Sequence, residues 1–371
     1  MPTPPPERTI QRHLLALLEV SGPLTRAELA GLAGLPPTTV AGVVKELLRS
    51  GHLDEVVSES TPHRAGRPPR ALALAGPLRV VAVVGLRDGG LRLTLATVAG
   101  EVLTDRSEAV ATRRRDPGSL FAPTAAMLLA TLRDAEVSRP RLMAVVLGVA
   151  RPQAQIHSAA PLEERVGVPV IVENDANLGA LGEAAFGAGR GLDSFVYVML
   201  GHGVGAGLVF GSRLHRGASG FAGELAHVQV REPGDGPPCV CGGRGCLASV
   251  IGPSLSEFVG RAYAERLSVA QVLSLAADQE PGVRRVFADL GRTVGRPLAD
   301  LCTILDPAAV VVDGSLGAAG PPVMTGIRET IDRHAAPAVA DSIQVLTGEL
   351  GELAEVLGGV ALVRQRSLDA P

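Results

Sequence analysis

The sequence predicts an α/β protein with a small, mainly helical segment at its amino terminus. From residue 77 onward, short apolar runs, glycine-rich loops and segments of helical periodicity follow one another, as in strand-loop-helix units. Before residue 76, two short helical segments are separated by a tight turn that contains glycine. The 371 residues can form two or three separate cores. We therefore expect one domain over residues 6–75 and a larger body over residues 77–371.

The composition is that of an ordinary globular protein. Hydrophobic residues make up 46% of the chain and charged residues 20%, and the net charge is −3. This charge excludes a strongly basic chain, although a mildly acidic total can conceal a small basic face. No apolar run reaches the roughly 18 residues of a membrane span, and the amino terminus lacks the pattern of a signal peptide. The sequence predicts a cytoplasmic protein without a membrane partner.

Three helices are predicted within the first fifty residues. Apolar residues recur at helical spacing over residues 8–20. Thr25 and Glu28 form a capping-box pattern that begins a second helix over residues 26–32. After a glycine- and proline-containing turn, a third helix is predicted over residues 38–49. Two short helices joined by such a turn have the geometry of a helix-turn-helix.

The third helix and the segment after it carry groups that suit DNA. Thr38 and Thr39 are small polar groups at the start of this helix, where base edges or phosphates are contacted. Residues 53–58 and 71–75 are predicted to form the two strands of a wing. Between them, the segment TPHRAGRPPR holds arginines on a stiff, extended scaffold that suits a minor groove. The predicted DNA contacts are Arg26, Thr38, Thr39, Lys45, Arg64, Arg67 and Arg70.

This segment has a second interpretation, as a three-helix protein-interaction module followed by a solvated linker. Arg26, at the front of the second helix, suits a phosphate contact about as well as a plain surface position. The helix pair, turn, wing and basic tip nevertheless occur in the order of a winged helix-turn-helix domain, which favours DNA binding.

The body is predicted to contain repeated strand and helix segments. They are two strands and a turn over residues 80–105, a helix over 120–136, strands within 141–150 and 166–175, a hairpin over 195–217, and a helix followed by a strand and a glycine loop over 294–317. Two such α/β halves would place a cleft between them. The glycine loops at residues 201–207 and 314–320 suit either phosphate binding or simple tight turns.

One short motif, VIVENDANLGALGE, carries the first candidate chemistry. It places Glu173, Asn174 and Asp175 between an apolar strand and a helix. A carboxylate beside an amide at a strand end is suited to binding a polyol and to taking a proton from it.

A second motif, GELAHVQVREPGDGPPCVCGGRGC, carries metal-binding groups. Cys239, Cys241 and Cys246 have the spacing C-x-C-x4-C, and His227 lies twelve residues before the first of them. Three thiolates and one imidazole form a closed tetrahedral set that suits a structural Zn²⁺ within residues 227–246. Free thiols and a redox pair are the alternatives. Cys302 lies in an apolar helical segment and is expected in the core.

The chain resembles the transcriptional regulators of the ROK family, from about Arg8 to about Arg364. The resemblance rests on the GRPP of the wing and on four further motifs. These are ENDANLGALGE, GHGVGAGLVFGSRLHRGASGFAGELAH, CVCGGRGCL and DPAAVVVDGSLG. It implies an actin-like, hexokinase-like fold with two α/β lobes around a sugar cleft, zinc in one lobe, and a homodimer or homotetramer.

The resemblance also implies roles for single residues. Asn174 and Glu224 match residues that hold sugar hydroxyls, and Asp175 matches the general base of the ROK kinases. His227 matches a zinc ligand that braces the sugar site. The ligand-binding residues predicted on this basis are Asn174, Asp175 and Glu224, and the predicted zinc ligands are His227, Cys239, Cys241 and Cys246.

The chain departs from the kinases of that family at its phosphate loops. Gly85 takes the place of a carboxylate, and His202 stands where the second loop has a threonine. Ala248 replaces a sugar-binding glutamate, and the segment 148–170 is shorter than in the family. Phosphoryl transfer depends on positioning and charge neutralisation, so we expect no catalytic residue and no enzyme activity.

The sequence therefore predicts a repressor of carbohydrate-related genes that binds a double-stranded DNA operator and responds to a sugar. The first alternative is a ROK-like regulator whose body has lost sugar binding and serves oligomerisation or another effector. The second is a residual sugar kinase.

Overall fold

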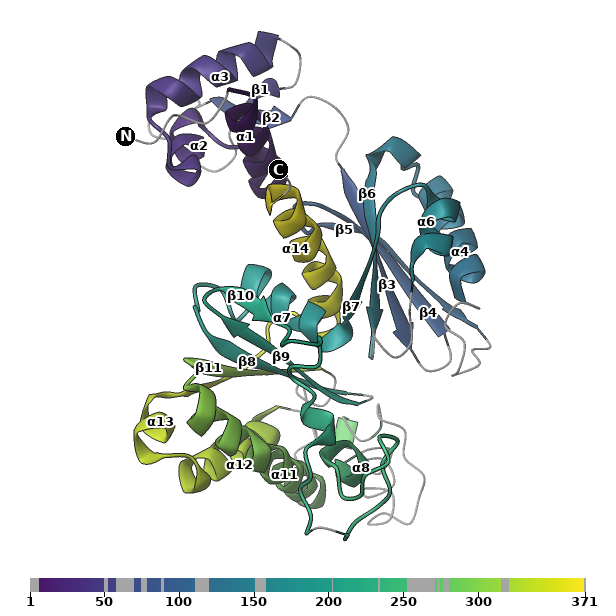
Figure 1. Cartoon of the computed structure of the whole chain (residues 1–371), viewed down its shortest axis with the longest axis vertical. Helices are drawn as coiled ribbons and strands as arrows, with labels where there is room; N and C mark the ends of the chain where they lie inside the picture. Colours follow the sequence, from purple (N-terminus) through teal and green to yellow (C-terminus); the bar gives the residue numbers. More distant parts are fainter. Residues whose placement is uncertain are drawn as a thin grey trace. The chain divides into compact units, whose positions relative to one another are not determined.

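A computed structural model of the chain contains the predicted α/β fold and the predicted amino-terminal helices (Figure 1). The chain divides into two compact units, one made of Met1–Leu147, Ser158–Ile171 and Val360–Pro371, the other of Gly148–His157 and Val172–Gly359. The structure describes residues 7–49, 53–57, 70–74, 79–87, 90–110, 120–150, 158–201, 203–232, 234–251, 271, 274–275, 280–314 and 320–369.

Five elements form the amino-terminal segment. They are helices α1 (Glu7–Ser21), α2 (Arg26–Ala33) and α3 (Pro37–Arg49), and strands β1 (Leu53–Val57) and β2 (Arg70–Leu74). These elements are confirmed, with ends that differ from the predicted ones by one residue. The apolar residues that predict the helices are buried together in one core, which includes Leu14, Leu29, Val44, Leu53 and Leu72.

The turn chemistry between these helices follows the sequence. Thr25 and Glu28 form the expected capping box, in which the Glu28 carboxylate accepts from Thr25 N at 2.8 Å. Gly34 ends α2 with a φ of 62°, a conformation that favours glycine. Helices α2 and α3 meet at 116°, as in a helix-turn-helix. Taken together these two helices have the length and hydropathy of a membrane span, whereas no single helix of the described residues does.

The first of two five-stranded sheets has the strand order β5-β4-β3-β6-β7. Its strands are β3 (Val80–Arg87), β4 (Gly90–Thr97), β5 (Val102–Ala109), β6 (Leu142–Val149) and β7 (Val170–Asn174), and α4 (Phe121–Asp134), the 3-10 turn η2 (Arg139–Arg141) and α6 (Ala160–Val166) accompany them. The two strands predicted over residues 80–105 are confirmed as β3 and β4, but the prediction missed a third strand, β5. It lies at the sheet edge with mostly exposed polar side chains, so no apolar run marks it.

The second sheet repeats this strand order as β10-β9-β8-β11-β12. Its strands are β8 (Phe195–Leu200), β9 (Val204–Phe210), β10 (Arg213–His215), β11 (Ala309–Asp313) and β12 (Gln344–Thr347). The remaining elements are α7 (Asp175–Phe186), η3 (Leu225–His227), α8 (Leu247–Ile251), α11 (Pro281–Leu305), α12 (Pro321–His334), α13 (Pro337–Ser342), η5 (Gly351–Leu353) and α14 (Ala354–Asp369). In both sheets the first three strands form an antiparallel meander, so the sequence contains two related α/β halves, as predicted.

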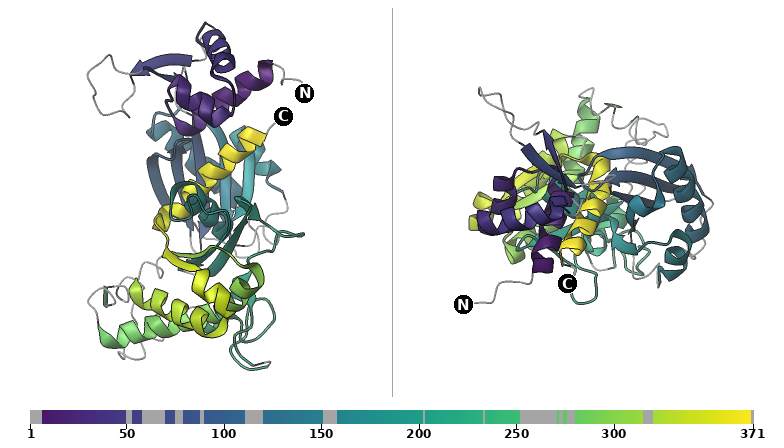
Figure 2. Two further views of the ribbon diagram at one scale, coloured as in Figure 1. Left: turned by 90° about the vertical axis from the view of Figure 1, so that its left-hand side faces the viewer. Right: turned by 90° about the horizontal axis from the view of Figure 1, so that it is seen from above.

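Helices cover both faces of the second sheet. Helices α11 and α12 run side by side along one face and share its core, while α7 packs on the other face against Phe195 and Tyr197 (Figures 1 and 2). Gly291 and Gly326 allow the two helices to touch, because a Cβ on either glycine would overlap a backbone carbonyl of the other helix. Cys302 is fully buried in α11, which confirms its place in the core.

Candidate functional site

The motif at residues 173–175 forms the junction between β7 and α7. Asn174 is the N-cap of α7: its Oδ1 accepts from Asn177 N at 3.0 Å, and its Nδ2 donates to Ala150 O at 3.0 Å. Asp175 is the first residue of the helix, and its Oδ1 accepts from Ala176 N at 2.8 Å. Both side chains are half-buried, so each can still offer polar atoms to a ligand at the amino end of the helix.

Glu173, which the sequence groups with these two residues, has a different role. Its side chain is buried, and one oxygen accepts from Asn174 N and from Asn177 Nδ2, both at 2.9 Å. Its other oxygen accepts from Arg216 Nε at 2.8 Å and lies 2.8 Å from Arg216 Nη2. No local sequence pattern indicates this pair, because Arg216 lies 43 residues further along the chain. Glu173 therefore holds the junction together rather than facing a ligand.

Glu224 lies on the loop after β10, and that loop is packed tightly against β9. Gly223 has a φ of +87°, and a Cβ there would overlap the carbonyl oxygen of Ala206. In the same strand, a Cβ on Gly205 would lie 2.7 Å from the Cβ of Ala176, at the start of α7. Strand β9 thus contacts both the loop that holds Glu224 and the start of α7 that holds Asp175. Asn174, Asp175 and Glu224 all belong to the second unit.

Two glycines of β9 have a packing role in this arrangement. Gly205 and Gly207 lie within β9 and face Ala176 and Ala180 of α7, where any side chain would collide. The two interpretations of this loop were phosphate binding and simple tight turns; close packing within β9 is a third role, and it accounts for Gly205 and Gly207. His202 lies outside the described residues.

The four predicted metal ligands come together. The ligand atoms of His227, Cys239, Cys241 and Cys246 all lie within 4.8 Å of one another. His227 Nδ1 is 3.4 Å from Cys239 Sγ, and Cys241 Sγ is 3.6 Å from Cys246 Sγ. The tight turn that brings the thiols together closes with a bond from Cys239 N to Gly243 O at 2.8 Å. Three sulfurs and one imidazole nitrogen at such separations fit a tetrahedral metal ion.

The thiols of this cluster differ in acidity. A hydrogen bond from the backbone of Gly243 lowers the pKa of Cys241, which is exposed. Burial raises the pKa of Cys246 to about 12. A bound cation would favour the thiolate form of both.

His227 also connects the metal cluster to Glu224. Its Nδ1 faces Cys239, while its Nε2 lies 3.8 Å from Glu224 Oε2. If Nδ1 binds a metal, the ring proton is on Nε2 and points toward the Glu224 carboxylate. The metal would thereby orient a candidate ligand-binding side chain.

The predicted DNA contacts in the described residues fall into two groups. On α3, Thr38 and Lys45 are exposed and Thr39 is half-buried, so this helix presents them to a partner. Arg26 and Arg70 are instead both paired with Glu55. Arg64 and Arg67 lie outside the described residues.

A buried pair of carboxyl groups, unforeseen from the sequence, lies beside the second glycine loop. Glu183 of α7 and Asp313 of β11 are 0% and 3% exposed. Glu183 accepts from Ala188 N at 2.6 Å and Leu350 N at 2.9 Å, and Asp313 accepts from Gly314 N at 2.7 Å and Tyr197 Oη at 3.3 Å. Burial and the charge of Glu183 raise the pKa of Asp313 to about 6.

Asp313→Asn is expected to stabilise the protein above pH 7. The pKa of an unfolded aspartate is about 3.9, so the native state binds the Asp313 proton more tightly than the unfolded state does. The stability that this proton contributes is lost as pH rises from about 4 through about 6. The loss amounts to about 2–3 kcal/mol at neutral pH. Denaturant unfolding should show the variant more stable than wild type by about 2–3 kcal/mol at pH 7.5 and by about 1 kcal/mol at pH 4.5.

Asp300→Asn is the control for that measurement, because Asp300 is an exposed aspartate of the same unit that pairs with Arg296. A pH-independent difference for Asp313→Asn, or an equal gain for Asp300→Asn, would contradict the raised pKa of Asp313.

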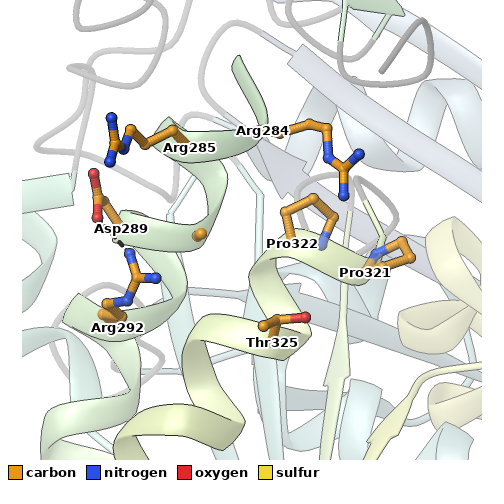
Figure 3. A pocket seen from close by; sticks show the side chains of 8 residues that line it. Arg284, Arg285, Asp289, Arg292, Pro321, Pro322 and Thr325 are labelled. Atoms are coloured by element: carbon orange, nitrogen blue, oxygen red, sulfur yellow. Dashed lines mark hydrogen bonds and ion pairs between the residues drawn. The ribbon is translucent and has the colours of Figure 1, made fainter. Parts of the chain in front are cut away.

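A separate hollow lies at the amino-terminal ends of α11 and α12 (Figure 3). It is lined by Arg284, Arg285, Ala288, Asp289, Arg292, Pro321, Pro322 and Thr325. Arg292 is engaged by Asp289 at 2.6 Å and by Glu329 at 2.9 Å. Pro321 and Pro322 begin α12 without N–H groups, so this helix end offers an anion few donors. None of the predicted site residues that the structure describes lines this hollow.

Comparisons with known proteins cover both the body and the amino-terminal segment. The profile of the ROK family matches residues 146–366, more than half of the chain. A glucokinase of Halalkalibacterium halodurans is 31% identical over 316 residues, which are 76% of this chain and 95% of that protein. The xylose repressor of Bacillus subtilis is 24% identical over 377 residues, which are 97% and 96% of the two chains. A solved ROK family transcriptional regulator, a homologue of the E. coli MLC protein, is 24% identical, with 98% and 97% coverage and a TM-score of 0.77.

Proposed function

Because the chain belongs to the ROK family, we propose that it is a DNA-binding transcriptional regulator that represses carbohydrate-related genes. In this proposal residues 6–75 bind DNA and residues 77–371 sense a sugar. The observation that carries it is the helix pair at 116°, whose second helix presents polar groups next to a two-stranded wing. The xylose repressor of Bacillus subtilis supports it, because that similarity extends over 97% of this chain and so includes this segment.

The proposed DNA contacts differ in whether their side chains are already paired with another residue. Thr38, Thr39 and Lys45 lie on the accessible side of α3, which would enter the major groove. Arg64 and Arg67 of the wing are proposed for the backbone or minor groove. Arg26 and Arg70 each donate to Glu55, which offsets part of the positive charge that they offer to phosphate. Two copies of such a domain bind two half-sites, so we propose a homodimer or homotetramer.

The proposed effector site consists of Asn174, Asp175 and Glu224. A carboxamide and two carboxylates provide both donors and acceptors for sugar hydroxyls. His227 and the cysteines would hold a structural Zn²⁺ that fixes the Glu224 side chain. The metal set is closed, so it leaves no coordination position for a substrate.

A sugar kinase is the second candidate, favoured by the 31% identity to a glucokinase and by Asp175 in the place of the kinase base. Against it, Gly85 lies inside the β3–β4 hairpin, paired with Arg92, where the kinases hold a carboxylate for the phosphate. ATP-dependent phosphorylation of a hexose, abolished in Asp175→Asn, would establish the kinase.

The proposal is tested by binding of the purified protein to DNA from its own upstream region, at one fixed salt concentration. We expect this duplex to bind about 10³-fold or more tightly than a scrambled duplex of equal length. Equal affinity for the two duplexes would overturn the proposal.

A further inference from the structure

Glu55, in the middle of β1, joins two cationic side chains from different elements. Arg26 Nη2, at the start of α2, lies 2.6 Å from Glu55 Oε1, and Arg70 Nη1, at the start of β2, lies 2.5 Å from Glu55 Oε2. Each carboxylate oxygen therefore has its own guanidinium. The side chain of Glu55 is 24% exposed, and those of Arg26 and Arg70 are 44% and 54% exposed.

The strand register determines the face of the wing sheet on which Glu55 lies. Glu55 pairs with Leu72 across the antiparallel ladder, and directly opposed residues point to the same face of a sheet. Leu72 is fully buried, and so is Leu53, two residues before Glu55 on that same face. Glu55 thus lies on the same face of the wing sheet as these two leucines, whereas its neighbour Asp54 lies on the other face; both acidic residues are exposed. The Glu55 carboxylate lies at the margin of the core, where the two guanidinium groups reach it.

The same register brings the two arginines to it. Leu24 bridges to Leu72 through backbone bonds of 3.1 and 2.7 Å, which sets Arg26, two residues later, beside the wing. Arg70 pairs with Val57 and therefore shares the face of Glu55. The contact thus connects the start of α2 to both strands of the wing.

We infer that Glu55 is a positioning residue for DNA recognition: it fixes the wing against α2 and withholds Arg26 and Arg70 from DNA phosphates. This inference rests on the proposed DNA-binding function. Free arginines attract the backbone of any duplex, which adds affinity without sequence information. Holding them on Glu55 lowers non-specific binding, and fixing the wing preserves the orientation that reads the operator. Both effects raise the ratio of specific to non-specific affinity.

The test compares Glu55→Gln with wild type on the upstream duplex and on the scrambled duplex, between 50 and 200 mM salt. Each added phosphate contact steepens the slope of log affinity against log salt concentration by about 0.9. Two released arginines should make the loss of scrambled-duplex affinity across this range about tenfold larger than in wild type. We also expect tighter binding to scrambled DNA at low salt and a lower ratio of specific to non-specific affinity.

Asp54→Asn is the matched control, because it removes one negative charge from the adjacent residue on the other face of the strand. It should leave the salt dependence close to that of wild type. In Glu55→Gln/Arg70→Gln, only one arginine is released, so the slope of log affinity against log salt should be about 0.9 less steep than in Glu55→Gln. A matching thermal unfolding transition for each variant confirms that the domain is folded.

Three outcomes would overturn the inference. The first is a salt dependence in Glu55→Gln equal to that of wild type. The second is a salt dependence in Asp54→Asn that is as steep as the one in Glu55→Gln. The third is an unchanged ratio of specific to non-specific affinity. If the wild type binds neither duplex, the proposed function fails and the inference falls with it. If the wild type prefers the upstream duplex and Glu55→Gln behaves like it, only the inference fails.

Discussion

Cys246→Ser is expected to release the metal ion and to unfold the segment from Glu224 to Leu247. Cys246 is 1% exposed and immediately precedes α8, and the described residues of the segment before it contain only η3, tight turns and isolated bridges. So little regular structure provides little stability of its own. Structural zinc contributes about 10–16 kcal/mol of apparent binding free energy in small zinc-dependent peptides, so its loss outweighs the local packing.

Metal analysis of the purified protein is expected to give about one Zn²⁺ per chain for wild type and almost none for Cys246→Ser. Amide hydrogen exchange should show loss of protection confined to this segment and its neighbours. Cys302→Ala is the control, because Cys302 is a buried cysteine of α11 outside the cluster, and it should retain the metal. Wild-type protein that is folded and metal-free would contradict the zinc site.

Arg216→Met should destabilise the second unit by about 2–4 kcal/mol. Among the described residues, Arg216 is the one cationic hydrogen-bond partner of the buried Glu173 carboxylate, and the substitution removes it. Breaking a buried pair costs about 3–5 kcal/mol, and the lower end applies here because the Arg216 side chain is 43% exposed. Denaturant unfolding of the variant measures the loss.

Two further variants separate this effect from a general loss of charge. In Arg216→Met/Glu173→Gln the unpaired charge is absent, so most of the lost stability should return. Arg190→Met removes a surface pair with Glu349, in which both side chains are more than half exposed, and should cost less than about 1 kcal/mol. If Arg216→Met costs no more than Arg190→Met, Glu173 does not depend on Arg216.

The features that the sequence predicts correctly are those whose residues lie close together along the chain. The capping box at Thr25, the His227 and cysteine set, and the strand-to-helix junction at Asn174 each lie within about twenty residues, and the structure contains all three. Local periodicity was also enough for the helices of the amino-terminal segment.

The features that the sequence does not predict depend on contacts between distant segments. Glu55 meets Arg26 across 29 residues, and Glu173 meets Arg216 across 43. Glu183 and Asp313 become neighbours only when α7 packs against the sheet that contains β11. Strand β5 was missed for a different reason, because a polar edge strand resembles a loop in sequence. Tertiary packing, rather than any local motif, brings the members of these three pairs into contact.

Operator affinity at fixed salt, titrated with a panel of sugars, tests sugar sensing by the body most directly. We expect one sugar or sugar derivative to weaken operator binding by the wild-type protein, and Asp175→Asn to abolish this response while operator affinity without sugar is retained. Tight operator binding that no sugar alters would contradict a sugar-sensing body, and it would favour a regulator whose body serves oligomerisation or another effector.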